Sequence, residues 1–349
     1  MNLIIGPQVT HSATSAVTNT ALEVKWLTVD EESAGQRLDN FLIRHLKGVP
    51  KTHVYRIIRS GEVRVNKGRA AADTRIEMGD VVRLPPVRIS DKVAEKAARP
   101  APGREFPLLL EDDALMAIDK PAGVAVHGGS GVSFGIIEQL RQARPQAKLL
   151  ELVHRLDRET SGILLVAKKR SALKHLQDQF RERETGKTYL ALVQGSWPEK
   201  LKVIDSSLHK YLLPDGERRV KVTTPEYPDG MRSITLVKVS ERLNDCTLLE
   251  VTIKTGRTHQ IRVHTSMHGF PIFNDATYGG DGIVRGPQRG SYRSFVTKCL
   301  QEMPRMALHA KTLGFVHPET GANMFFDSDL PSDFEQTLQA WKEWAATEG

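Results

Sequence analysis

Apolar residues near the start of the chain recur first with helical spacing and then with strand spacing. The segment 38–46 places Leu or Phe every three or four residues, and 54–58 repeats this spacing after a glycine and proline break. The stretches 61–66 and 80–84 then alternate apolar and polar residues, as short strands do. With a further alternating stretch at 21–30, the pattern predicts a strand, two helices and a hairpin.

From about residue 108 onward the apolar runs are short and rich in strand-forming residues. The predicted strands lie at 114–120, 162–169, 188–195, 233–239, 246–256, 258–265 and 321–328. The predicted helices lie at 134–144, 171–183 and 331–346. Many strands and few helices predict an α+β domain built on a mixed, mostly antiparallel β-sheet.

Composition divides the chain into four parts. Residues 1–22 are rich in Ser, Thr and Asn and show no periodicity, which predicts a flexible tail. The strand, helix and hairpin pattern fills 23–87, and the Pro- and Ala-rich stretch 88–106 predicts a linker. We expect the larger domain to cover 107–349.

The charge of the chain is concentrated in its first module. The whole chain of 349 residues carries a formal net charge of +7. Residues 36–86 alone hold eleven Lys and Arg against five Asp and Glu, so this segment accounts for nearly the whole surplus. Such a concentration favours RNA binding over an ordinary solvated surface. Lys51 and Arg59 share one face of the second predicted helix, and with Arg56 they are the RNA contacts that we expect.

Cysteine usage and hydropathy bear on the compartment. Cys246 and Cys299 are the two cysteines, too few and too far apart in sequence for a zinc site or a disulfide framework. The N-terminus lacks the basic start and long apolar run of a signal peptide. No apolar stretch approaches the roughly 18–20 residues that span a bilayer. We therefore expect a cytoplasmic protein, monomeric by default, with no membrane partner.

Nucleotide and metal chemistry find little support in the sequence. The five letters HRLDR at 154–158 are similar to part of a kinase catalytic loop, but the Gly-rich phosphate loop and the DFG motif are absent. No phosphate-binding or dinucleotide-binding glycine motif occurs either. His259 and His264 are five residues apart, and on a strand their side chains would point to opposite faces. We therefore expect neither a metal nor a nucleotide cofactor.

Asp157 is the leading candidate for a reactive group. It lies in the stretch LVHRLDRETSGILLVAKK, directly before a run of apolar residues that is typical of a buried strand. Glu159 is two residues away, and Arg155 and Arg158 flank the pair. A carboxylate beside an arginine stays ionised at neutral pH, which suits a nucleophile or an electrostatic anchor rather than a general acid.

Two further segments carry polar groups on predicted strands. In 258–265 the alternation places Arg262 between Gln260 and His264 on one face of the expected strand. Tyr189 lies in the predicted strand 188–195, and Lys187 directly precedes it. Two residues apart, their side chains share one face of this strand. In a basic protein with an RNA-binding module, an arginine, a tyrosine and an aspartate at strand ends suggest a site for an RNA nucleotide.

Two groups of motifs resemble known families. The segment RLDNFLIRHL, the later RSGEVRVN and the GDVV at 79–82 resemble the S4 RNA-binding domain, with Thr52-His53 as a mild departure. The segments KPAGVAVHGG, LVHRLDRETSGILLVAKK, KTYLALVQG and TGRTHQIRVH resemble, in this order, the RluA family of pseudouridine synthases. This resemblance implies an enzyme that isomerises uridines of bacterial 23S (large-subunit) ribosomal RNA to pseudouridine without a cofactor.

The resemblance also implies roles for individual residues. Asp157 would be the catalytic aspartate, Arg262 the basic partner that keeps it ionised, and Tyr189 the tyrosine against the target base. Arg155 would help to displace the extruded nucleotide, and Ile261 would form an apolar wall beside the base. Target-specific RNA contacts are expected in 280–304 from three arginines, namely Arg285, Arg289 and Arg293.

Several alternatives stay open from the sequence. The same chemistry could act on other ribosomal RNA or transfer RNA uridines, or the chain could be a non-catalytic S4 assembly factor. A glycosidase using Asp157 and Glu159 lacks the aromatic residues that would stack on a sugar. Asp157 could attack C1′ or C6 or promote loss of the C2′ proton, and Tyr189 could act as a base or as a stacking surface.

Overall fold

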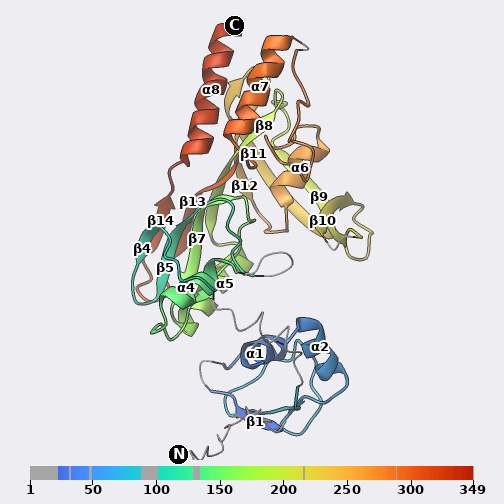
Figure 1. Ribbon diagram of the computed structural model, residues 1–349, viewed down its shortest axis with the longest axis vertical. Coiled ribbons are helices and arrows are strands. Elements are labelled where there is room, and N and C mark those ends of the chain that lie inside the picture. Colours follow the sequence, from blue (N-terminus) through green and yellow to red (C-terminus); the bar gives the residue numbers. More distant parts are fainter. Residues whose placement is uncertain are drawn as a thin grey trace, which may run out of the picture. The chain divides into compact units, whose positions relative to one another are not determined.

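The fold was taken from a computed structural model that describes residues 23–30, 33–46, 49–87, 101–128, 134–214, 217–287 and 289–348. The chain separates into two compact units, Met1–Pro100 and Ala101–Gly349 (Figure 1). None of the helices within the described ranges is long and apolar enough to cross a membrane.

The first unit contains the predicted strand, two helices and hairpin. Its elements are β1 (Lys25–Thr28), α1 (Leu38–His45), α2 (Lys51–Arg59), β2 (Arg64–Val65) and β3 (Val81–Leu84). The strands form a three-stranded antiparallel sheet in the order β1-β3-β2. The apolar residues that predicted the two helices, such as Leu38, Leu42 and Ile57, are buried in one core with Val82 of the sheet.

The second unit is built on an 11-stranded sheet, which confirms the predicted fold class. Its strands are β4 (Leu108–Glu111), β5 (Leu115–Lys120), β6 (Glu151–Leu152), β7 (Ser161–Ala167), β8 (Gly186–Gln194), β9 (Val203–Leu212), β10 (Arg218–Thr223), β11 (Met231–Leu243), β12 (Cys246–Ile253), β13 (Leu308–Val316) and β14 (Asn323–Asp327). The main path runs β10-β9-β11-β12-β8-β13-β7-β5-β4. β7 and β13 pair in parallel, and every other strand pair in the described residues is antiparallel.

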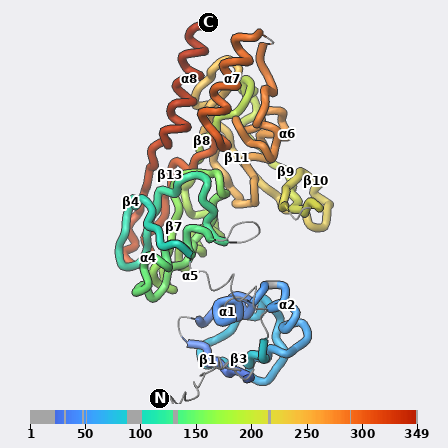
Figure 2. The backbone as a smooth tube through the Cα atoms, in the orientation of Figure 1, coloured from blue at the N-terminus to red at the C-terminus, as the bar shows by residue number. Residues whose placement is uncertain are grey.

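Five helices accompany this sheet in the described residues, and α7 and α8 lie side by side (Figures 1 and 2). They are α4 (Ile136–Ala143), α5 (Arg170–Glu182), α6 (Gln260–Met267), α7 (Gly290–Glu302) and α8 (Ser332–Glu348). The first, second and last agree with the helices predicted from the sequence. α7 was not predicted, and it occupies part of the 280–304 segment.

The predicted strand at 258–265 is wrong, because these residues form most of α6. Six consecutive residues of this helix, 260–265, are buried. A helix that is buried on all sides has no polar face, so its sequence lacks the period of 3.6 that marks a surface helix. The alternation of apolar Ile261 and Val263 with polar neighbours then reads as a strand.

The expected tail and linker fall mostly outside the described residues. Residues 1–22 and 88–100 are not described. Residues 101–106, expected in the linker, belong to the second unit. The side chain of Phe106 is buried in a core with α4, and the Arg104 N–H donates to the carbonyl of Gln139 at 3.3 Å. One buried aromatic therefore attaches this segment to the larger unit.

β7 directly follows the segment 153–160, which contains the predicted catalytic aspartate. All seven of its residues are buried. Its parallel pairing with β13 brings Gly162 against Ala310, and a Cβ atom at Gly162 would lie 2.2 Å from the Ala310 carbonyl oxygen. Gly162 also has a φ of +106°, a conformation that other residues rarely adopt.

We expect Gly162→Ala to lower the free energy of unfolding by at least about 2 kcal/mol, because it adds backbone strain and overlap with a carbonyl oxygen. Urea unfolding monitored by circular dichroism measures this change. Gly186→Ala is the matched control, since a Cβ atom at Gly186 on β8 meets no atom within 4 Å. Equal unfolding free energies for the two variants would contradict the close approach of β7 and β13.

Candidate active site

Asp157 lies on the loop between β6 and β7, and backbone contacts hold this loop in place. The N–H of Thr160 donates to the Asp157 carbonyl at 3.2 Å. Lys120, at the end of β5, is buried, and its Nζ donates to the carbonyl oxygens of Arg158, Pro121 and Val124 at 3.0, 2.8 and 2.8 Å. The Lys120 ammonium thus connects the Asp157 loop, through the Arg158 carbonyl, to the turn after β5, through the other two carbonyls.

Arg262 connects Asp157 with a second carboxylate, that of Asp275. Its Nη1 lies 3.3 Å from Asp157 Oδ2. Its Nε and Nη2 donate to the two oxygens of Asp275 at 2.7 and 2.8 Å, and Asp275 is buried. Asp275 therefore receives the short bidentate pair, and Asp157 receives a single, longer contact from the remaining nitrogen.

The charge of Arg262 is stabilised by its surroundings. Burial by itself lowers the pKa of Arg262. The hydrogen bonds and charge of Asp275, together with the charge of Asp157, raise this pKa by more than burial lowers it, so the net shift is upward. The guanidinium also lies over the Tyr278 ring, 5.0 Å from its centroid. Arg262 thus remains a fixed positive charge beside Asp157.

His259 is a second neighbour of Asp157. It precedes α6 with a φ of +52°, and its Nε2 lies 3.9 Å from Asp157 Oδ2. Its Nδ1 is 2.8 Å from the Tyr278 hydroxyl. Burial lowers the pKa of His259, against the opposite effect of the Asp157 charge. His259 is therefore mainly neutral at pH 7, and Arg262 supplies the positive charge.

A buried polar network attaches α6 to the sheet. The two ring nitrogens of His264 lie 2.8 Å from Thr235 Oγ1 and 2.9 Å from Ser206 Oγ. The side-chain amide of Gln260 donates to Thr235 Oγ1 at 2.9 Å. Burial and, to a lesser degree, the neighbouring His268 lower the pKa of His264 to about 4. The network holds the Gln260 and His264 face of α6 against the sheet, and Arg262 therefore projects from the opposite face of the helix.

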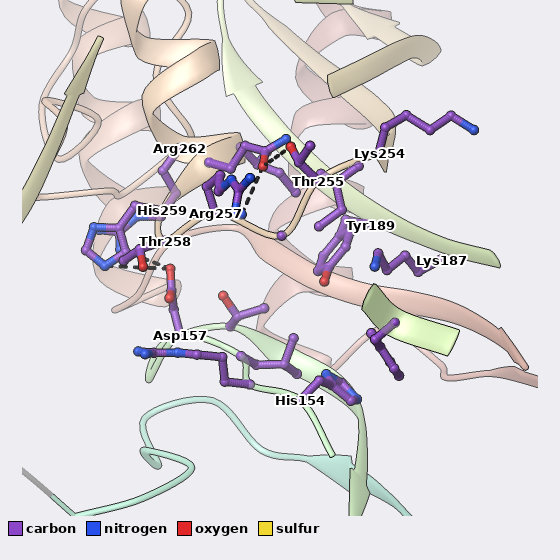
Figure 3. Close-up of a pocket in the computed structure, with 18 of the residues that line it drawn as sticks. His154, Asp157, Lys187, Tyr189, Lys254, Thr255, Arg257, Thr258, His259 and Arg262 are labelled. Carbon is purple, nitrogen blue, oxygen red and sulfur yellow. Dashed lines mark hydrogen bonds and ion pairs between the residues drawn. The ribbon is translucent and has the colours of Figure 1, made fainter. Parts of the chain in front are cut away.

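Tyr189 comes from β8, between β12 and β13. Its hydroxyl points into the cavity in Figure 3, and Lys187 lies on the same side of the strand, as predicted. Burial, and then the charge of Asp157, raise the pKa of Tyr189 well above its usual value. The phenol is therefore protonated throughout the neutral range.

Four of these groups, Asp157, Tyr189, His259 and Arg262, line one cavity of about 510 Å³ (Figure 3). This volume is within the range of small-ligand pockets, roughly 300–1,000 Å³. Asp157 is the single carboxylate among the described residues that line it. The lining arginines and lysines are Arg155, Arg181, Arg183, Lys187, Lys254, Arg257 and Arg262. The cavity therefore suits a polyanion that brings an uncharged group to Asp157.

The structure brings together the three residues predicted to be catalytic and the two predicted to contact the target nucleotide. They line this cavity, and they are Asp157, Tyr189, Arg262, Arg155 and Ile261. The side chain of Arg155 is exposed, and that of Ile261 is buried.

The predicted RNA contacts lie elsewhere. Arg56 and Arg59 are exposed on α2 of the first unit, and the side chain of Lys51 is outside the described part. None of the three arginines of the 280–304 segment lines the cavity, and they are Arg285, Arg289 and Arg293. The guanidinium of Arg285 lies 4.5 Å from the centroid of the Phe270 ring.

Three contacts of the site were not predicted from the sequence. Asp275 and Tyr278 follow the apolar residues Ile272 and Phe273, and neither belongs to a motif that we singled out. His259 was considered only as a metal ligand. The signal available was an aspartate and a tyrosine at a turn after an apolar run, which is common at the ends of buried segments.

The described residues contain no group of three or more His, Cys, Asp or Glu side chains that could hold a metal ion.

The motifs and the site agree with one family of enzymes. The family model described as RNA pseudouridylate synthase matches residues 114–267, and the S4 domain model matches residues 36–82. The first range contains Asp157, Tyr189 and Arg262, and the second lies within the first unit. With the relatives described next, this match shows that the chain belongs to the RNA pseudouridylate synthase family, whose members are isomerases that convert uridine to pseudouridine.

Curated relatives cover nearly the whole chain. Proteins named ribosomal large subunit pseudouridine synthase C from Haemophilus influenzae and Escherichia coli (strain K12) are 46% and 47% identical to it, over 325 and 320 residues. The alignments cover 92% and 90% of this chain and 96% of each relative. The solved structure of human RNA pseudouridylate synthase domain containing 4 shares the fold, with a TM-score of 0.55 and 24% identity over 67% of this chain and 92% of that one.

We expect Asp275→Asn to lower kcat for pseudouridine formation about ten- to a hundredfold, because Arg262 is then no longer held in one orientation. KM for RNA should change little, since Asp275 is buried and does not line the cavity. Single-turnover kinetics at saturating RNA measure the effect. In an Arg262→Gln background the same substitution should have no further effect on kcat. Additive losses in the double variant would contradict this role.

The lowered pKa of His264 predicts a pH-dependent stability. The unfolded chain binds a proton below pH 6.5 that the folded protein does not accept until about pH 4. As the pH is lowered from 6.5 to about 4, the free energy of unfolding should therefore decrease, by at most about 1.4 kcal/mol per pH unit from this group. His264→Gln should reduce the slope, and His175→Gln, at an exposed position of α5, should leave it unchanged. Urea unfolding at pH 7 and pH 5 measures both slopes.

Proposed function

We propose that this protein isomerises specific uridines of bacterial large-subunit ribosomal RNA to pseudouridine, with Asp157 as the essential catalytic group. The observation that carries the proposal is the contact between Asp157 and Arg262 inside a cavity lined by cations. The names of the curated relatives support ribosomal RNA as the substrate. The reaction takes place in the cytoplasm, where the protein acts as a monomer.

The chemistry requires little besides a placed carboxylate. The base detaches from C1′, turns, and rejoins the ribose through C5, so the product has the same atoms as the substrate. No redox agent or group donor is consumed. Asp157 acts either by attacking C1′ or C6 or by assisting loss of the C2′ proton. In each case the carboxylate must act in its charged form and lie close to the nucleoside, and Arg262 places a positive charge 3.3 Å from Asp157 Oδ2.

Tyr189 serves as a surface for the base and as a hydrogen-bond donor. Its raised pKa keeps the phenol protonated, which opposes a role as a general base in the resting enzyme. The ring lies in the same cavity as Asp157, and Ile261 provides an apolar neighbour. Of the two roles that the sequence left open for Tyr189, stacking is the better supported.

The target nucleotide must leave its helical stack before it reaches Asp157. This extrusion costs a few kcal/mol, and the protein must offset this cost. Arg155 is exposed on the loop that carries Asp157, and it lines the cavity. A planar cation at this position occupies the space that the nucleotide leaves and pairs with a neighbouring phosphate.

Further contacts supply affinity for the RNA backbone. On the first unit these are Lys51, Arg56 and Arg59 of α2. Near and on α7 they are Arg285, Arg289 and Arg293. Such contacts are electrostatic and respond to salt, whereas the contacts at Asp157 decide the chemistry.

We expect Asp157→Asn to abolish conversion while RNA affinity stays within a few-fold of the wild type, because the amide keeps the shape of the side chain and loses its charge. Conversion is measured by mapping pseudouridine chemically in ribosomal RNA after incubation, and affinity by a binding titration of the same RNA.

Glu159→Gln is the matched control. Glu159 is on the same loop, but it pairs with Arg158 at 3.2 Å and does not line the cavity. This variant should keep most of its activity. Substantial conversion by Asp157→Asn would reject Asp157 as the catalytic group. Absence of conversion by the wild-type protein on any ribosomal RNA, with binding intact, would favour an assembly factor instead.

A further inference from the structure

Within the described residues of the first unit, helices cover one face of the sheet and leave the other face uncovered. Leu27 pairs with Val82, and Val82 pairs with Val65, and these three residues pack in or against the core that contains α1 and α2. Paired residues on neighbouring strands point to the same side of a sheet, and successive residues point to opposite sides. The next residues in register, Trp26 and Arg83, therefore point away from the helices.

Three side chains lie in one row across this uncovered face. Trp26 of β1 pairs with Arg83 of β3, and Arg83 pairs with Arg64 of β2. We call the surface formed by Trp26, Arg64 and Arg83 the Trp26 face. Adjacent strands are about 4.8 Å apart, so the row places an indole and two guanidinium groups side by side.

Trp26 is unusual among the tryptophans of the chain. It is 54% exposed, whereas Trp197 and Trp341 are each 1% exposed. A tryptophan exposed to water lacks the large favourable free energy that its burial would give. Exposed aromatic side chains next to cations are typical of surfaces that bind nucleic acid. Packing within the fold therefore does not explain why a tryptophan occupies position 26.

The two arginines keep their positive charge available. Arg83 donates from Nη1 to the carbonyl of Glu62 at 2.6 Å, which orients the guanidinium. Among the described residues, neither Arg64 nor Arg83 forms an ion pair with a carboxylate. Their neighbours in register are a tryptophan and each other. The face is therefore positively charged and complementary to phosphate.

We propose that the Trp26 face binds an unpaired segment of RNA, with one base stacked on the indole of Trp26 and the backbone phosphates held by Arg64 and Arg83. The proposal rests on the proposed function, since it names a second contact with the same class of substrate. It is separate from the RNA contacts of α2, because Arg56 and Arg59 belong to the helices on the other side of the sheet.

The chemistry of the face selects single-stranded RNA over other partners. An indole stacks on a base whose face is open, which base-paired RNA does not offer along its length. Two arginines in a row match phosphate groups through charge and bidentate hydrogen bonds. A protein partner would instead require a larger apolar area or acidic groups of its own.

The test compares two RNA ligands for the full-length protein: a hairpin from large-subunit ribosomal RNA with a single-stranded tail and the same hairpin with a blunt end. We expect Trp26→Ala to weaken binding of the tailed hairpin about tenfold, which corresponds to the loss of one stacked base. Binding of the blunt hairpin should be unchanged, and Trp26→Phe should retain most of the affinity for both.

Two controls separate stacking from charge. Phe325→Ala removes another exposed aromatic, 69% exposed on β14 of the second unit, and should leave both affinities unchanged. Arg64→Gln should reduce the slope of log K against log salt for the tailed hairpin by about 0.7, the value for one single-strand phosphate contact. Trp26→Ala should leave this slope as it is in the wild type.

Tryptophan fluorescence provides a second readout. The difference between the wild type and Trp26→Phe isolates the emission of Trp26 from that of the other three tryptophans. In the free protein iodide should quench this emission, and the tailed hairpin should protect it. Trp26 that resists iodide without RNA, or protection that requires ribosomal protein instead of RNA, would overturn the proposal.

The failure of this proposal is distinguishable from failure of the proposed function. At saturating RNA, Trp26→Ala should convert uridine at the wild-type rate, because the Trp26 face contributes only affinity. Asp157→Asn should show the opposite pattern, with intact binding and no conversion. Wild-type affinity of Trp26→Ala for the tailed hairpin rejects the Trp26 face alone, and conversion by Asp157→Asn rejects the catalytic assignment alone.

Discussion

The structure of the site depends on how one guanidinium group is divided between two carboxylates. Asp275 takes the Nε and Nη2 of Arg262 in two short hydrogen bonds, and Asp157 has only Nη1 at 3.3 Å. Without Asp275, two nitrogens of the Arg262 guanidinium could pair with the two oxygens of Asp157 in a bidentate ion pair. Because Asp275 takes Nε and Nη2 of Arg262, Asp157 has a positively charged neighbour that contacts only its Oδ2.

Other parts of the second unit serve to keep this division in place. Hydrogen bonds of Gln260 and His264 to the sheet set the orientation of α6, and with it the direction of Arg262. Lys120 holds the loop of Asp157 through a hydrogen bond to the backbone carbonyl of Arg158. Asp157 precedes Arg262 and Asp275 by more than a hundred residues, so the sheet must bring their segments together to place Asp157 within hydrogen-bond distance of Arg262.

The two units contribute differently to one task. The second unit contains the chemical site, with a single carboxylate in a cavity whose other charges are positive. The first unit carries most of the net charge of the chain in a small module with two distinct surfaces, one on α2 and one on the Trp26 face. Charge that is spread over exposed side chains binds RNA without regard to sequence, and the buried, oriented groups are reserved for the reaction.

The sequence by itself determined the fold class, many of the local elements and the family. Periodicity predicted α1, α2 and most strands, and the order of four motifs pointed to Asp157, Tyr189 and Arg262 as partners. Only the tertiary structure decided that 260–267 is a helix, since a segment buried on every side shows no helical period. It alone brought Asp275 to Arg262 and His259 to Asp157, because contacts between side chains of different elements depend on how those elements pack, which no local pattern records.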